Sequence, residues 1–157
     1  MGNQFWETPT ELISTLEENQ GVKFTIDLSA TKENKKAPLW VGPGSSIAED
    51  LLAWNPPFNT HEAWLNPPYE NLAPWAEWVA RNSPNFTSIS VLVPGDFSTK
   101  WWETFYKSAN VSLLLTPRVG FVNPDTGKPV QGNPKPNTLF CYWRDGTRQE
   151  TMLYRWK

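Results

Sequence analysis

The stretch that decides the fold class is Ser88-Ile89-Ser90-Val91-Leu92-Val93, which Pro94-Gly95 ends. An apolar run of this length, followed by residues that break a strand, is typical of a strand buried on both faces of a sheet. Such strands belong to sheets whose two faces are covered by helices. The stretch therefore points to a layered α/β protein, and the sequence on either side of it agrees.

Strands and helices are predicted in alternation along the chain. The predicted strands are residues 23–27, 37–41, 62–65, 88–93, 111–116, 138–143 and 151–156, and the predicted helices are residues 9–19, 46–53, 73–81 and 99–108. Thr8 is a favourable N-cap for the first helix, Pro9 suits its first position, and Gly21 ends it. The last two strands flank Asp145-Gly146, which favours a hairpin turn. This order predicts a three-layer α/β fold whose sheet is mostly parallel, with an antiparallel hairpin at its edge.

The composition supports one globular domain spanning residues 1–157. With 39% hydrophobic and 19% charged residues, the chain has enough apolar surface for a core and too little charge for a disordered protein. No stretch approaches the roughly 18 apolar residues of a membrane span, and the N-terminus has no basic start followed by an apolar run, so we expect a cytoplasmic protein. Cys141 and His61 are each the only residue of their type, which excludes a disulfide framework and argues against a metal site.

The charge is distributed unevenly along the chain. Residues 1–80 contain 4 Lys+Arg and 11 Asp+Glu, whereas the rest of the chain contains 10 Lys+Arg and 5 Asp+Glu. The basic part includes residues 117–137, a stretch without hydrophobic periodicity that is rich in proline and glycine. Loops this long in a compact domain are usually functional or disordered. Its cations Arg118, Lys128 and Lys135 make it the segment that we expect to grip a polyanionic substrate.

A turn suited to catalysis follows the strand predicted at residues 62–65. Ligands bind at the carboxyl ends of parallel strands, and this strand ends at Asn66-Pro67-Pro68-Tyr69. The two prolines make the turn rigid. The Asn66 side-chain oxygen and the Pro67 carbonyl can each accept one hydrogen of an exocyclic amine, while Tyr69 stacks on the ring that carries the amine. These contacts direct the nitrogen lone pair at an electrophile, so positioning would do most of the catalysis and no general base is required.

Structural roles compete with functional ones at several positions. A second copy of the pattern, Asn55-Pro56-Pro57-Phe58, shows that two prolines after an asparagine can be a plain loop feature. It follows a predicted helix rather than a strand, so we assign the functional role to Asn66. Arg118 is equally compatible with a phosphate contact and with a structural ion pair, and Asp96 could line a pocket or cap the helix that follows it.

Short motifs occur in a characteristic order along the chain. They are Trp6-Glu7-Thr8-Pro9, Phe24-Thr25-Ile26-Asp27-Leu28-Ser29-Ala30, Asn66-Pro67-Pro68-Tyr69, Leu92-Val93-Pro94 and Pro117-Arg118-Val119-Gly120-Phe121, with tryptophans at positions 54, 75, 101 and 102 between them. This ordered set resembles the phage-type DNA N6-adenine methyltransferases, the short Dam-like family, over almost the whole chain. The resemblance implies a Rossmann-like domain that moves the methyl group of S-adenosylmethionine to N6 of adenine in DNA. It also implies a location in the host cytoplasm if the chain is encoded by a virus.

The resemblance also implies roles for individual residues. Asn66-Pro67-Pro68-Tyr69 would be the catalytic turn around a flipped-out adenine. The implied cofactor-binding residues are Trp6, Thr8 and Pro9 at the methionine end, Asp27, Ser29 and Ala30 after the first strand, and Asp50 at the adenine end. No acid directly follows the second strand to bind the ribose hydroxyls, and the turn after the first strand lacks the glycine-rich signature that is usual for this cofactor. Arg118, Lys128 and Lys135 would grip DNA, and a homodimer that shares this task is an open alternative.

Two other classes of function stay open at this point. The same turn serves enzymes that methylate an RNA base or the side-chain amide of a protein glutamine. Alternatively, the ten tryptophans could form a non-enzymatic stacking surface for single-stranded nucleic acid. Exposed tryptophans would favour that surface, whereas buried ones would favour the methyltransferase, and we expect Trp75 and Trp78 to pack in the core.

Overall fold

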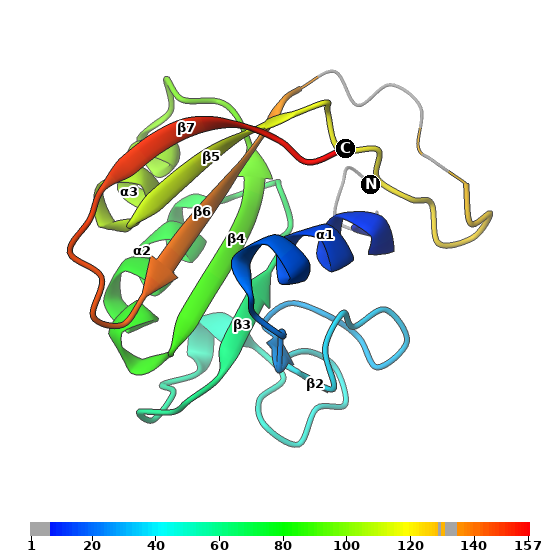
Figure 1. Cartoon of the computed structure of the whole chain (residues 1–157). Coiled ribbons are helices and arrows are strands. Elements are labelled where there is room, and N and C mark those ends of the chain that lie inside the picture. Colours follow the sequence, from blue (N-terminus) through cyan, green and yellow to red (C-terminus); the bar gives the residue numbers. More distant parts are fainter. Residues whose placement is uncertain (1–6, 129, 131–134) are drawn as a thin grey trace.

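A seven-stranded sheet runs through the computed structural model of the chain, which describes residues 7–128, 130 and 135–157 (Figure 1). The strand order is β2-β1-β3-β4-β6-β5-β7. The strands are β1 (Ile26–Asp27), β2 (Leu39–Trp40), β3 (Glu62–Leu65), β4 (Ser88–Pro94), β5 (Val111–Thr116), β6 (Asn137–Trp143) and β7 (Glu150–Arg155). All neighbouring strands are parallel except the two pairs that involve β6. The predicted α/β fold with a mostly parallel sheet is confirmed.

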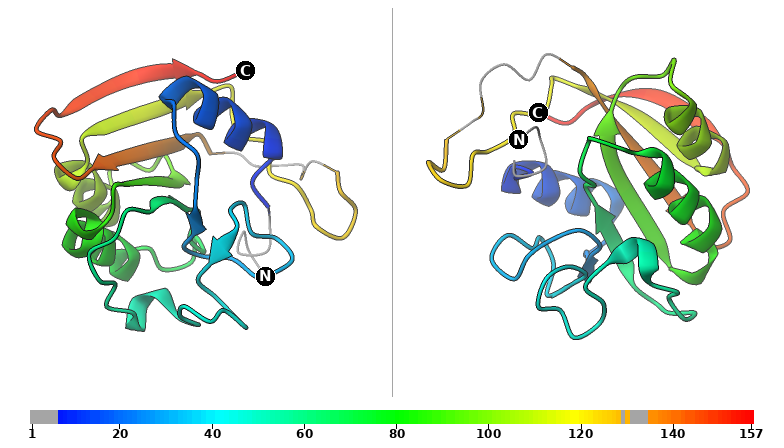
Figure 2. Two further views of the ribbon diagram at one scale, coloured as in Figure 1. Left: turned by 60° about the horizontal axis from the view of Figure 1, so that its bottom comes forward. Right: turned by 180° about the vertical axis from the view of Figure 1, so that it is seen from behind.

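Helices cover both faces of this sheet, so the molecule has three layers (Figure 2). Helix α1 (Thr10–Gln20) lies on one face, and α2 (Ala73–Asn82) and α3 (Lys100–Ser108) lie on the other. Two short 3-10 helices, η2 (Leu51–Ala53) and η3 (Ser83–Asn85), lie in the connections. None of the helices in the described part of the chain has the length and hydrophobicity that a bilayer crossing requires.

Strand β4 lies between two hydrophobic cores. All seven of its residues are buried, as its apolar run predicted. Leu92 packs in the core beneath α1, whereas Val91 and Val93 pack in the core beneath α2 and α3. Full burial of each such side chain contributes about 1.5–3 kcal/mol, so this strand stabilises both layers at once.

The hairpin predicted at the sheet edge is wrong. Strand β6 pairs antiparallel with β4 and β5, and β7 pairs parallel with β5, so β5 separates the two strands. Six residues of β6 are buried, which suits an interior strand, whereas no residue of β7 is fully buried. Asn110 joins the two strands to the start of β5: its Oδ1 accepts the amide of Trp143 at 2.8 Å, and its carbonyl accepts the amide of Glu150 at 2.9 Å.

The helix predicted at residues 46–53 is shortened to the single 3-10 turn η2. Two acidic side chains in this segment bind backbone amides: Glu49 binds back to the turn after β2, and Asp50 caps η2. Glu49 accepts the amide of Gly44 at 3.1 Å, and Asp50 accepts that of Leu52 at 3.1 Å. Such local side-chain contacts compete with helix formation.

Candidate active site

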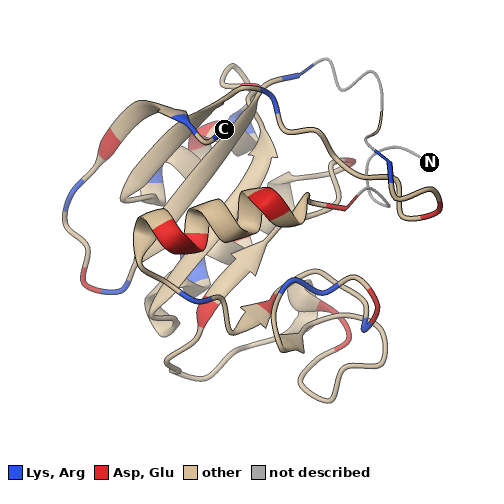
Figure 3. Cartoon of the chain, turned by 45° about the vertical axis from the view of Figure 1, so that its right-hand side comes forward, with Lys and Arg blue, Asp and Glu red and all other residues tan. Residues whose placement is uncertain are grey.

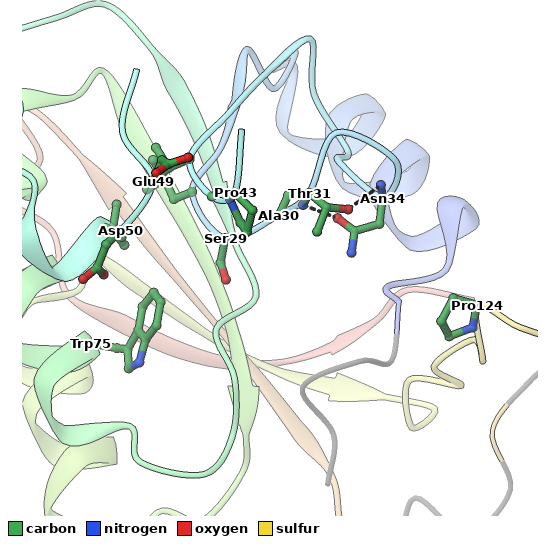
Figure 4. Close-up of a pocket in the computed structure, with 13 residues that line it drawn as sticks. Ser29, Ala30, Thr31, Asn34, Pro43, Glu49, Asp50, Trp75 and Pro124 are labelled. Carbon is green, nitrogen blue, oxygen red and sulfur yellow. Dashed lines mark hydrogen bonds between the residues drawn. The ribbon is translucent and has the colours of Figure 1, made fainter. Parts of the chain in front are cut away.

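Two adjoining cavities lie where the parallel strands β1, β2 and β3 end. The larger, of about 320 Å³, is lined by residues that follow β1 and β2, by residues 49–51, by Trp75 of α2 and by Pro124 (Figure 4). The smaller, of about 50 Å³, is lined by Thr8, Asp27, Ser29, Asn34, Lys36, Trp64, Asn66 and Pro68. Because Ser29 and Asn34 line both cavities, the two spaces form one continuous candidate site.

The larger cavity depends on close packing of two turns. Ala30, after β1, donates its amide to the carbonyl of Val41, after β2, at 3.1 Å. Gly42 permits this approach, because a Cβ at this position would lie 1.8 Å from the Ala30 carbonyl oxygen. Gly42 therefore allows the turn after β2 to pack against the backbone of the turn after β1.

Acidic and aromatic side chains form one wall of the larger cavity. Figure 4 shows Glu49 and Asp50 close together, with the indole of Trp75 beside Asp50 and with Pro124 on the opposite side. Asp50, predicted from the resemblance, therefore lies in the cavity, as do Ser29 and Ala30. Trp75 is half-buried and belongs to this wall as well as to the core predicted for it.

Glu49 lines the larger cavity although the sequence did not predict it there. The expected position for an acid was directly after the second strand. The chain folds back after β2, since the amide of Gly42 donates to the carbonyl of Ala48 at 3.0 Å. This reversal carries Glu49 to the cavity although it is nine positions beyond Trp40, the last residue of β2. The Gly42-Pro43-Gly44 sequence was the signal for such a reversal.

Asp27 ends β1 and faces the smaller cavity. Its side chain is only 3% exposed and accepts two backbone amides, from Ser29 at 3.2 Å and from Lys36 at 2.9 Å. Burial raises the pKa of its carboxyl to about 7, although these two hydrogen bonds and the charge of Lys36 oppose the shift. Near neutral pH this group can therefore hold or release a proton.

Asn66 follows β3 and lies in the same cavity. Its Nδ2 donates a hydrogen bond to the hydroxyl of Thr8 at 3.0 Å. Its Oδ1 is buried and has no hydrogen-bond partner among the described residues. The predicted capping role of Thr8 is wrong, because α1 begins at Thr10 without a side-chain cap and the Thr8 hydroxyl is used by Asn66 instead.

Tyr69 is anchored at the end of the same turn. Its hydroxyl donates to the carbonyl of Leu92 at 3.3 Å, and its ring meets that of Phe121 edge to face, with centroids 6.1 Å apart. Burial raises the pKa of the phenol well above its usual value, so Tyr69 stays protonated. The repeated pattern at Asn55 lines neither cavity: Asn55 is exposed, and the Pro56 carbonyl accepts a hydrogen bond from Asn85 at 3.1 Å.

The first part of residues 117–137 is built into the site. Val119 and Phe121 are buried, and Val122 exchanges two backbone hydrogen bonds of 2.8 Å with Glu7. This bridge holds the N-terminal segment, including Pro9, near the turn at residues 66–69, which Thr8 contacts through Asn66. Trp6, expected beside it, lies outside the described residues.

The predicted DNA-gripping cations lie on or beside the same segment, and Figure 3 shows several basic positions along it. Arg118 and Lys128 are exposed, whereas the Lys135 ammonium is 2.8 Å from the carboxylate of Asp96. Asp96 is therefore an ion-pair partner, and the cap of α3 is Thr99, which accepts the amide of Trp102.

Comparison with known proteins shows the family of the chain. A family model described as DNA N-6-adenine-methyltransferase (Dam) matches residues 2–154. The chain belongs to the Dam family. A DNA N-6-adenine-methyltransferase of Haemophilus phage HP1 (strain HP1c1) is 26% identical over 139 residues, which cover 87% of this chain and 77% of the phage protein.

A second relative of this Dam-family chain is the DNA N-6-adenine-methyltransferase of Escherichia phage T1. It is 27% identical over an aligned length of 163, covering 93% of this chain and 66% of the phage protein. No solved structure matches the chain significantly. The resemblance deduced from the ordered motifs is confirmed by the family match.

Proposed function

We propose that this chain is a single Rossmann-like methyltransferase domain that transfers the methyl group of S-adenosylmethionine to N6 of adenine in DNA. The observation that carries the proposal is the buried Oδ1 of Asn66, which has no hydrogen-bond partner among the described residues and lies beside a polar cavity in a Dam-family chain. Buried polar atoms are rarely left unsatisfied, and those that are often mark a functional site. An exocyclic amine of the substrate would supply the missing donor.

The acidic and aromatic side chains around the two cavities fit S-adenosylmethionine, which would supply an electrophilic methyl group. Asp27 in the small cavity can pair with the ammonium of its methionine end, next to Thr8. Glu49 can accept hydrogen bonds from ribose hydroxyls, while Asp50 and the Trp75 ring, which offers an apolar face to a purine, lie side by side for the adenine end. A volume of about 320 Å³ lies within the usual range for small-molecule sites.

The catalytic turn would act by positioning. Asn66 Oδ1 and the Pro67 carbonyl accept the two amine hydrogens, which orients the nitrogen lone pair for attack on the methyl carbon. S-adenosylmethionine, when bound, would supply the electrophilic methyl group and leave as the thioether S-adenosylhomocysteine, and the methylated amine would release one proton to solvent. An adenine must leave the duplex to reach this turn, and Tyr69, fixed by its hydroxyl, would stack on it.

DNA is favoured over the alternative acceptors by the family match and by the basic segment at residues 117–137. Arg118, Lys128 and Lys135 would contact phosphates, and a second copy of the chain would extend this basic surface. A tryptophan-lined stacking surface is disfavoured, because every tryptophan among the described residues is buried or half-buried.

The test is transfer of labelled methyl from S-adenosylmethionine to unmethylated DNA, followed by nucleoside analysis. We expect N6-methyladenine from the wild type and at least a hundredfold less from Asn66→Ala. Asn55→Ala is the matched control, because it alters the same sequence pattern outside the cavities, and it should retain activity. Label in RNA or protein but not in DNA would refute the proposed acceptor.

A further inference from the structure

We propose that Thr8 is a positioning residue: its hydroxyl holds the Asn66 amide so that the amide oxygen is directed at the reacting amine. This role rests on the proposed function and adds to it a residue that acts through another side chain. It is distinct from the cofactor contact that the resemblance implies for Thr8.

The structure shows which end of the Asn66 amide is held by Thr8 and which end is free. Asn66 carries two N–H donors at Nδ2 and one acceptor oxygen at Oδ1. Nδ2 is engaged by Thr8 Oγ1 at 3.0 Å, which leaves Oδ1 buried and available as an acceptor. The opposite orientation would present an N–H group to the substrate amine, and two donors facing each other cannot form a hydrogen bond.

Thr8 is well suited to this task because it is fixed on both sides. It is only 3% exposed. The residue before it, Glu7, forms the two-bond bridge with Val122, and the carbonyl of Pro9 after it accepts the amide of Leu12 at 3.1 Å in the first turn of α1. A short segment between two backbone anchors allows little movement of the hydroxyl.

The same anchors support the other end of the catalytic turn. Phe121, adjacent to Val122, packs edge to face against Tyr69. The first and last residues of the turn are therefore both held near the Glu7–Val122 bridge. Asn66 contacts Thr8, which follows Glu7, and Tyr69 contacts Phe121, which precedes Val122. Small errors in the placement of reacting groups are costly, since a misplacement of about 1 Å can reduce a rate about a hundredfold.

The direct test compares Thr8→Val, which keeps the shape but removes the hydroxyl, with Thr8→Ser, which keeps the hydroxyl. We expect the single-turnover rate of methyl transfer at saturating DNA and cofactor to fall about tenfold to a hundredfold in Thr8→Val and to recover in Thr8→Ser. The KM for DNA and the calorimetric affinity for S-adenosylmethionine should change less than threefold in both variants.

Three results would overturn the role. One is a Thr8→Val enzyme as fast as the wild type. Another is a Thr8→Ser enzyme as slow as Thr8→Val, which would assign the effect to packing of the methyl group. The third is a loss of cofactor affinity that accounts for the whole loss of rate, which would make Thr8 a cofactor contact only.

A second measurement does not depend on activity. In protein labelled with 15N at asparagine, the side-chain NH2 resonances of Asn66 are identified by their loss in Asn66→Asp. We expect one of them to shift and its exchange with solvent to accelerate in Thr8→Val but not in Thr8→Ser. If the wild type methylates no DNA, the proposed function fails by itself; unchanged Asn66 resonances in Thr8→Val would overturn the positioning contact.

Discussion

Asp27 combines deep burial with a position in the cavity that we assign to the amino-acid end of the cofactor. Its pKa is about 7 in the free protein. Pairing with an ammonium would lower this pKa, so cofactor binding would release a proton whenever Asp27 is protonated beforehand. Affinity for S-adenosylmethionine should therefore rise as the pH increases toward about 7, by at most tenfold per pH unit, and level off above that pH.

Calorimetry between about pH 5 and pH 8 will check this dependence. Asp27→Asn should bind the cofactor more weakly and without the rise, because an amide neither ionises nor pairs with a cation. The charge of Lys36 lowers the Asp27 pKa, so Lys36→Met serves as the control and should retain the rise, shifted toward higher pH. A wild-type affinity that is independent of pH over this range would show that no ammonium is bound beside Asp27.

Thr8 and Glu49 show which site residues the sequence could and could not indicate. Thr8 was predicted to cap the first helix, as its position before Pro9 favours. In the structure its hydroxyl instead accepts a hydrogen bond from Asn66, 58 positions away. Glu49 escaped prediction because its place depends on the reversal of the chain after β2. Departures from local rules are expected at functional sites, where a distant contact takes precedence.

At the level of elements, the contact between the turns after β1 and β2 shapes the larger cavity. Gly42→Ala should destabilise the protein by about 1–3 kcal/mol and lower cofactor affinity, because the new Cβ would clash with the Ala30 carbonyl and the φ of Gly42 is 152°. Urea unfolding and calorimetry measure the two effects. Gly120→Ala is the matched control, since nothing lies within 4 Å of its added Cβ, and it should be nearly neutral.

Two strands have the bounds that the sequence pattern predicted. β3 and β5 have the predicted bounds, residues 62–65 and 111–116. The separation of β6 from β7 by β5 was not predicted. Two strands joined by a turn at Asp145-Gly146 have the same local sequence pattern whether they pair with each other or with a strand between them. The amide and backbone of Asn110 decide between them, and this contact joins residues more than thirty positions apart.

At the scale of the whole molecule, the net charge of −2 is less relevant to DNA than the position of the cations. Arg118 follows the carboxyl end of β5 and Lys135 precedes the start of β6, so both lie at the edge of the sheet that also holds the turn at residues 66–69. Lys107, by contrast, lies in the last turn of α3, where the chain has crossed to the opposite edge. Only cations at the edge that holds the carboxyl end of β5 should contact DNA phosphates.

This asymmetry predicts how DNA affinity responds to salt. Lys128→Ala should weaken binding to all sequences and reduce the slope of log affinity against log salt by about 1, the value for one lost phosphate contact. Asp96→Asn should strengthen binding, because it removes a negative charge and releases Lys135 from an ion pair of 2.8 Å. Lys107→Ala removes the same charge as Lys128→Ala and should leave the slope unchanged.

Fluorescence anisotropy with a labelled duplex over a salt series measures DNA affinity for all three variants. An equal loss of slope in Lys107→Ala and Lys128→Ala would mean that DNA affinity depends on the total charge of the protein and not on this edge of the sheet.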